Sequence, residues 1–218
     1  MKESILILLI ILSFSCNLEA EEMTNNGFEF DGGVTYNNYL YKKYDIGQGG
    51  AELDNDYFIR EDLHSGTGYY LEAVYWLNSE FALGLGVQKN KMEAEWETES
   101  SHYYESTLDT YYTSLKYRLE DNVKLYFDLN YNNYNEYYSI ADFSTDIKKG
   151  AGLGVMIGTE INYSIYQNFD LRLQTGYYLA DIEIEERYSS YQGKIIDVDD
   201  EELEISGLGL KLGLEYKF

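Results

Sequence analysis

Residues 207–218 read GLGLKLGLEYKF, and this stretch decides the interpretation of the whole chain. Successive side chains of a β-strand point to opposite faces, so the alternation predicts a strand with one apolar face. The apolar face consists of Leu208, Leu210, Leu212, Leu214, Tyr216 and Phe218. The other face carries only glycine and the charged residues Lys211, Glu215 and Lys217.

This stretch resembles the C-terminal strand of bacterial outer-membrane β-barrels, an alternating strand with tyrosine two residues before a terminal phenylalanine. In that family the segment is recognised by the barrel-assembly machinery. The resemblance implies that this machinery is a partner of the chain. It also implies that the assembly signal consists of Leu212, Leu214, Tyr216 and Phe218.

The same apolar alternation recurs along the chain at regular spacing. It predicts further strands at 28–36, 69–77, 81–88, 110–119, 123–131, 150–163 and 169–179. With the terminal strand they make eight, and bacterial barrels have an even number of strands. We therefore expect an all-β fold, a single eight-stranded antiparallel up-and-down transmembrane β-barrel over residues 21–218. The pattern resembles the small OmpA/OmpX/OmpW-type barrels.

The predicted connections alternate in length. Short turns are expected at 78–80, 120–122 and 164–168, and long polar segments near 42–65, 89–109, 132–149 and 181–204. We expect strands to continue beyond the membrane into these segments, as residues 36–41, 134–138 and 182–184 suggest. Outer-membrane barrels have short periplasmic turns and long external loops. The loops are rich in tyrosine and the last is the most acidic, so they form a possible surface for a ligand.

The predicted inward face decides between a membrane barrel and a soluble one. Its acids are Glu29, Asp31, Glu72, Asp128, Glu160, Asp170 and Glu215, and its bases are Lys116, Arg118, Lys124, Arg172, Lys211 and Lys217. A narrow lumen must pair its charges, because an isolated buried ion costs several kcal/mol. A soluble version of this pattern would bury charge and expose an apolar belt. We expect these residues to form a charge network in the lumen, with outer-membrane lipids around the barrel.

Composition excludes other classes. The formal net charge of −23 argues against nucleic acid as a partner, because phosphate binding needs a basic surface. Proline is absent, which suits long hydrogen-bonded strands. No apolar run reaches the ~20 residues of a membrane-spanning helix.

The N-terminal residues predict a secretory signal. Lys2 precedes an apolar run over residues 5–12, and small residues follow. We expect a signal peptide at residues 1–20, with cleavage after Ser15 or Ala20. Cys16, the only cysteine, leaves lipidation open. The expected location is the cell outer membrane.

Other candidate sites have weaker support. The acidic run at 197–202 lacks the glycine and distal glutamate of a calcium-binding loop, so we predict no specific metal and no cofactor. His64 and His102 have serines beside them, including Ser65, but a catalytic triad is recognised by geometry and not by neighbours in sequence.

The expected function is that of a non-enzymatic outer-membrane surface barrel with acidic, tyrosine-rich loops, which serves envelope structure or adhesion. Two alternatives stay open: a narrow channel for small solutes and a lipid-modifying hydrolase. Inward glycines such as Gly84, Gly86 and Gly176 would either line a passage or make room for bulky neighbours.

Overall fold

The computed structural model describes residues 27–46, 65–96, 102–140, 143–189, 194–197 and 201–218. The strands are β1 (Phe28–Ile46), β2 (Ser65–Trp76), β3 (Phe81–Trp96), β4 (His102–Glu120), β5 (Val123–Ile140), β6 (Phe143–Tyr166), β7 (Phe169–Ser189), β8 (Lys194–Asp197) and β9 (Glu201–Lys217). Within these ranges no helix is long and apolar enough to cross a membrane.

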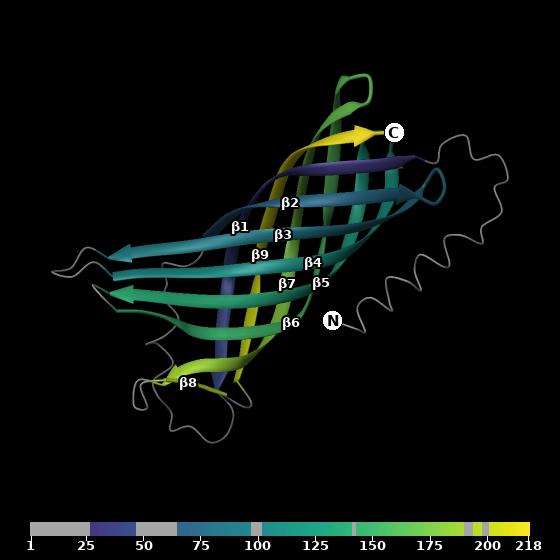
Figure 1. Cartoon of the computed structure of the whole chain (residues 1–218). Coiled ribbons are helices and arrows are strands. Elements are labelled where there is room, and N and C mark those ends of the chain that lie inside the picture. Colours follow the sequence, from purple (N-terminus) through teal and green to yellow (C-terminus); the bar gives the residue numbers. More distant parts are fainter. Residues whose placement is uncertain (1–26, 47–64, 97–101, 141–142, 190–193, 198–200) are drawn as a thin grey trace.

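The long strands form a closed antiparallel ring (Figure 1). Strands β1 to β7 pair in sequence order, and β9 pairs with both β7 and β1. At the closure the Phe218 N–H donates to the Phe28 carbonyl oxygen over 3.0 Å. The short β8 pairs only with β7 and lies outside the ring. The predicted eight-stranded up-and-down barrel is confirmed.

Three tight turns lie where the sequence predicts short connections. In the β2–β3 turn the Asn78 side-chain oxygen accepts the N–H groups of Glu80 and Phe81, each over 2.8 Å. Asparagine favours such turns because its side chain substitutes for backbone hydrogen bonds. The β4–β5 turn is at Asp121, and the β6–β7 turn contains Gln167 with φ of 30°.

The strands are longer than predicted at the opposite end of the barrel. The strands continue into the segments at 89–109 and 132–149, as expected at 134–138, and leave shorter connections than expected: β3 continues to Trp96, β4 starts at His102, β5 continues to Ile140 and β6 starts at Phe143. Outside lipid a strand needs no apolar outer face, so a strand there resembles a polar loop in composition. In Figure 1, β3 to β6 run side by side toward the left of the view.

The expected acidic loop at 181–204 is also largely strand. β7 continues to Ser189 and β9 begins at Glu201, so most of these acids belong to the barrel wall. Asp181, Glu183 and Glu185 are exposed, whereas Ile182 and Ile184, which alternate with them, are buried. Residues 47–64, 190–193 and 198–200 of the predicted loops lie outside the described residues.

The outward side chains of the barrel form a wide apolar belt. Leu153, Ile157 and Leu214 are 64%, 62% and 54% exposed. A contiguous apolar surface of this size is typical of a lipid contact and would promote aggregation in water. Aromatic rings gather toward the short turns, where the rings of Tyr216 and Phe218 lie 4.7 Å apart. Such rings are typical of a membrane–water interface.

Candidate functional site: the filled lumen

Glu160 is the centre of an ionic network inside the barrel. Its Oε2 atom lies 3.0 Å from the Lys116 ammonium and 2.7 Å from the Arg172 guanidinium, and it accepts a hydrogen bond from Gln174 over 3.1 Å. Its Oε1 atom lies 2.9 Å from the Lys124 ammonium. Glu160 is fully buried, and these contacts offset the desolvation of its charge.

Arg172 joins three strands through its guanidinium group. It donates to Asp31 of β1, and its Nη2 atom lies 2.6 Å from Glu72 of β2. Lys116 reaches the same Glu72 oxygen over 3.0 Å. Arginine suits this position because its planar group presents several donors to carboxylates at once. The network therefore spans the lumen from wall to wall.

A second set of contacts lies nearer the short turns. Lys124 lies 3.3 Å from both Glu29 and Glu215. Lys217, which is partly exposed, pairs with Asp170 over 2.5 Å and lies 3.6 Å from Glu215. The C-terminal strand thus contributes charges to the lumen while its leucines face outward.

The third set is looser and is covered by aromatic rings. Lys211 lies 3.7 Å from Asp128, beyond direct hydrogen-bond range. Its ammonium lies 4.1 Å from the ring centroid of Tyr112 and 5.5 Å from that of Tyr70. A cation over an aromatic face is attracted by the ring's quadrupole, so the tyrosines supplement a weak ion pair.

Arg118 departs from the predicted network. Its guanidinium carbon lies 3.9 Å from the ring centroid of Trp76, and its side chain is only partly buried. A register shift separates Arg118 from Glu120 in the pairing with β5, so strict alternation ends there. The structure brings the other predicted lumen charges together as ion pairs.

Inward glycines accommodate the tyrosine rings. Tyr126 is buried, and a side chain added at Gly158 or Gly176 would come within 2.7 and 2.4 Å of its hydroxyl oxygen. These glycines are successive cross-strand neighbours of Tyr126 on β6 and β7. Gly86 meets the Tyr112 ring in the same way. The glycines therefore make room for bulky neighbours and do not leave a passage at these positions.

An apolar cluster extends from Tyr126, the cross-strand partner of Lys116, toward the end of the lumen away from the short turns. Its members are Met92, Leu108, Tyr126, Tyr134, Met156, Tyr178, Ala180, Ile182, Ile184, Leu203 and Ile205. The alternation at Ile182 and Ile184 predicts a strand continuation there, but sequence reasoning did not predict that these residues meet in one cluster, because most of the segments that hold it are polar on average.

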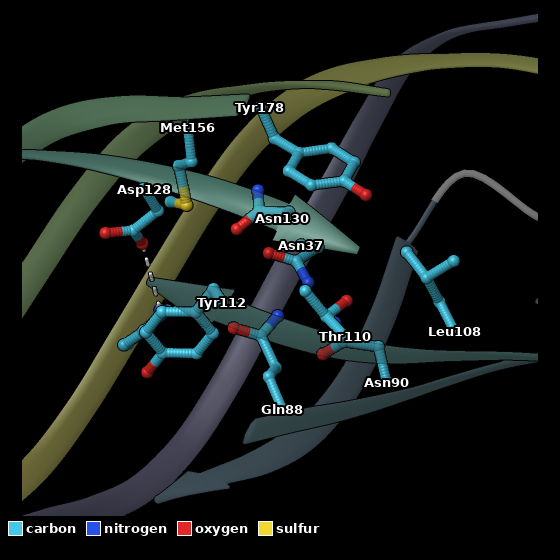
Figure 2. A pocket seen from close by; sticks show the side chains of 11 residues that line it. Asn37, Gln88, Asn90, Leu108, Thr110, Tyr112, Asp128, Asn130, Met156 and Tyr178 are labelled. Atoms are coloured by element: carbon cyan, nitrogen blue, oxygen red, sulfur yellow. Dashed lines mark ion pairs between the residues drawn. The ribbon is translucent and has the colours of Figure 1, made fainter. Parts of the chain in front are cut away.

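Polar side chains of several strands gather inside the barrel beside Leu108, Met156 and Tyr178 of the apolar cluster (Figure 2). They surround a cavity of about 10 Å³, lined among others by Asn37, Asn90, Thr110 and Asp128. Asn90 accepts a hydrogen bond from Thr35, while its amide nitrogen has no hydrogen-bond partner within the described part of the chain. A polar cavity of this size holds about one water molecule.

The residues of the assembly signal lie at the closing seam. Leu212 and Leu214 face outward, Phe218 is exposed, and Tyr216 is half-buried with its ring 4.9 Å from that of Phe169. β9 completes the ring by pairing with β1. The role of these residues as an assembly signal stays a prediction.

The other candidate sites lie mostly outside the described residues. His64, Cys16 and residues 1–20 are among the undescribed residues, and Ser65 begins β2. Among the described residues no group of histidine, cysteine and acidic side chains has the arrangement of a metal site.

Known proteins resemble this chain in structure but not in sequence. No protein-family model matches the chain, and no curated protein matches its sequence. The outer-membrane protein OprG from Pseudomonas aeruginosa is similar in structure, with a TM-score of 0.55, 13% identity, and coverage of 88% of this chain and 96% of OprG.

Two further solved structures are similar over most of their length. Ail, the attachment invasion locus protein of Yersinia pestis, has a TM-score of 0.49, 15% identity, and coverage of 88% of this chain and 99% of Ail. The protease OmpT from Escherichia coli has a TM-score of 0.46, 11% identity, and coverage of 93% and 99%.

The closed ring, the apolar belt and the ionic lumen define the class of protein. It is a small transmembrane β-barrel of the bacterial outer-membrane type. Location in the outer membrane is consistent with the belt, because closed barrels are the only β-structures that satisfy their backbone in lipid.

Proposed function

We propose that this protein is a closed, non-enzymatic surface barrel that holds an acidic outer wall and tyrosine-rich connections at the cell surface, for envelope structure or adhesion. The observation that carries the proposal is the filled lumen. The ionic network around Glu160, the polar side chains around the small cavity and the apolar cluster together fill the interior of the barrel. Eight-stranded barrels have an interior just wide enough for such filling.

The surface part of the proposal is supported by the outward face of β7 and β9. Asp181, Glu183 and Glu185 are exposed on β7, and Glu202 is exposed on β9. These positions lie beyond the belt residue Leu179, so the acids stand where the wall leaves lipid. The signal peptide at 1–20, with cleavage after Ser15 or Ala20, and recognition by the assembly machinery belong to the same proposal.

Planar-bilayer recording of the purified, refolded protein tests closure. We expect no stable ion conductance in the wild-type barrel, since water would have to cross both the ionic and the apolar filling. Steady currents in the wild type would contradict the proposal and favour the narrow channel. A matched pair of variants, Ile182→Ser in the apolar cluster and Leu179→Ser on the outer wall, would then locate the leak.

Adhesion is tested with whole cells that display the barrel. We expect attachment to host matrix or to partner cells to fall when Asp181, Glu183, Glu185 and Glu202 are all changed to their amides. The matched control changes Glu80 and Asp121, which lie at the short turns, to their amides. Equal attachment by all three strains would contradict a role for the acidic wall.

The non-enzymatic part has its own test. Ser65→Ala and His102→Ala change the serine and the histidine that suggested a hydrolase. We expect envelope lipid composition to be the same with either variant as with the wild type. Loss of a lipid modification in one variant, with normal heat-modifiable folding, would favour the hydrolase.

A further inference from the structure

An oblique groove crosses the outer wall of the barrel over β1 to β6. Two neighbouring rows of outward side chains border it. The row nearer the short turns is Phe30, Ala73, Leu85, Thr113 and Leu129, which are successive cross-strand partners. The other row is Leu71, Val87, Tyr111, Tyr131 and Leu153. The groove has a volume of about 640 Å³.

The groove exists because the first row contains small residues. Ala73 and Thr113 are the shortest side chains in that row, whereas the Tyr111 and Tyr131 rings opposite are 53% and 47% exposed. Elsewhere the register also pairs bulky residues with one another, such as Leu173 with Leu212. The short side chains of Ala73 and Thr113, facing the Tyr111 and Tyr131 rings, thus form the concave surface.

The dimensions of the groove fit a single extended hydrocarbon chain. Strands lie about 4.8 Å apart, so each row, which crosses five strands, is about 19 Å long. With strands tilted by about 40°, such a row rises through the membrane by about 12 Å. This rise fits within one leaflet, which is about half of the ~30 Å hydrocarbon core. The volume also lies within the ~300–1,000 Å³ range of specific ligand sites.

The position of the groove indicates which leaflet supplies the chain. It starts at Phe30, two residues after β1 begins, next to the aromatic rings at the short turns. Short turns lie on the periplasmic side in this class of barrel. We propose that the groove binds one acyl chain of a phospholipid from the inner leaflet of the outer membrane.

Two features support an acyl chain as the occupant. The outward side chains that line the groove are all uncharged, and the groove is continuous with the lipid-facing belt. A preformed concave surface binds an acyl chain more tightly than the flat wall does. More of the chain is in contact, while the conformational entropy that the chain loses is about the same. The proposal goes beyond the function proposed above and depends only on the position of the barrel in the membrane.

Native mass spectrometry of the refolded full barrel in detergent, titrated with phosphatidylethanolamine, tests the proposal. We expect one tightly bound phospholipid per wild-type barrel. The double variant Ala73→Leu, Thr113→Leu fills the groove and should weaken binding by about tenfold or more, which corresponds to about 1.4 kcal/mol. Both substitutions place leucine against lipid, so the barrel should still fold, and heat-modifiability on a gel verifies this.

Thr175→Leu is the matched control. Thr175 is an exposed threonine on the β7 wall that does not line the groove, and the same substitution there should leave the bound phospholipid in place. Equal binding by the wild type and the groove-filling variant would overturn the proposal, as would an equal loss with Thr175→Leu.

Two further arms test the identity of the occupant. Lipopolysaccharide added in place of phosphatidylethanolamine should bind without any effect of the groove-filling variant. If the variant removes bound lipopolysaccharide, the occupant comes from the outer leaflet and the proposal is wrong. If the wild type is dimeric and the variant monomeric, the groove is an interface between copies of this chain, and the proposal is likewise wrong.

Discussion

The half of the lumen next to the short turns and the half at the opposite end are filled by opposite chemistry. In the first half, Lys116, Arg172 and Glu160 lie inside a wall whose outer face is apolar. In the second half, Ile182 and Ile184 lie inside a wall whose outer face is acidic.

The outer face of β7 changes from apolar to acidic along the strand, because one part of the strand lies in lipid and the other in water. Where lipid surrounds the barrel, apolar side chains face outward and the polar ones must pair with each other inside. Where water surrounds it, as in a soluble protein, the apolar side chains turn inward. On β7 the change falls between Leu179, exposed in the belt, and Asp181, exposed in the acidic wall.

The largest expected effect is in the ionic half. Arg172→Met leaves Asp31, Glu72 and Glu160 with fewer cations, and we expect the free energy of unfolding to fall by about 3–5 kcal/mol. Urea unfolding of the barrel in lipid vesicles measures the change.

Arg118→Met is the control for this prediction. Arg118 stacks on Trp76, and a cation over an aromatic ring contributes about 0.5–2 kcal/mol. Equal losses with the two variants would show that the network around Glu160 has no special role. The double variant Arg172→Met, Asp31→Asn should recover part of the loss, since Arg172 is the cation paired with Asp31 and its removal leaves that carboxylate buried without an ion pair.

A comparable loss is expected in the apolar half. Ile182→Ala opens a cavity in the buried cluster and should lower the free energy of unfolding by about 2–5 kcal/mol. Leu179→Ala on the outer wall should lower it less, because lipid chains fill the space. A larger effect at Leu179 in the same assay would contradict the assignment of inner and outer faces.

A smaller loss of stability is expected at the glycines that contact tyrosine rings. Gly158→Ala places a methyl group against the Thr175 carbonyl and the Tyr126 hydroxyl, and such overpacking costs about 1–3 kcal/mol. Gly27→Ala is the control, because its new methyl group would meet only the Phe218 carbonyl at 3.8 Å. A neutral Gly158→Ala, measured by thermal unfolding, would show that the Tyr126 ring packs elsewhere.

The smallest effect is expected on the acidic wall, and its sign is opposite. Glu183 and Glu202 are direct cross-strand partners, and like charges in such pairs destabilise by about 0.2–1 kcal/mol. Glu183→Gln should therefore raise the free energy of unfolding slightly at low salt. The gain should disappear at high salt, where exposed charges are screened. In 1 M salt the screening length is about 3 Å. If Glu183→Gln still raised the free energy of unfolding under that condition, the electrostatic origin would be contradicted.

The strand positions and the inward charges were predictable, because alternation with period two is a local property of the sequence. Glu160, Arg172 and Lys116 follow from it directly, and the ion pairs then follow from the narrow lumen. The apolar cluster was not predicted, because the segments that hold it are polar on average. Met92 and Leu108 alternate with polar residues there, so the period was present while the composition indicated loops.

The partners of individual charges could not be predicted. Cross-strand register decides which carboxylate meets which cation, and it depends on turns and bulges throughout the ring. The shift between Arg118 and Glu120 is one example, and it accompanies the stacking of Arg118 on Trp76.

A spin-label scan along the outer face of β7 tests the central claim most directly. Single cysteines at Leu171, Leu173, Leu179, Asp181 and Glu183, in a chain with Cys16 changed to serine, would be labelled in vesicles. We predict that oxygen in the lipid reaches the first three labels and that a water-soluble nickel chelate reaches the last two. Water access at Leu171 and Leu173, or lipid around Asp181 and Glu183, would contradict the account.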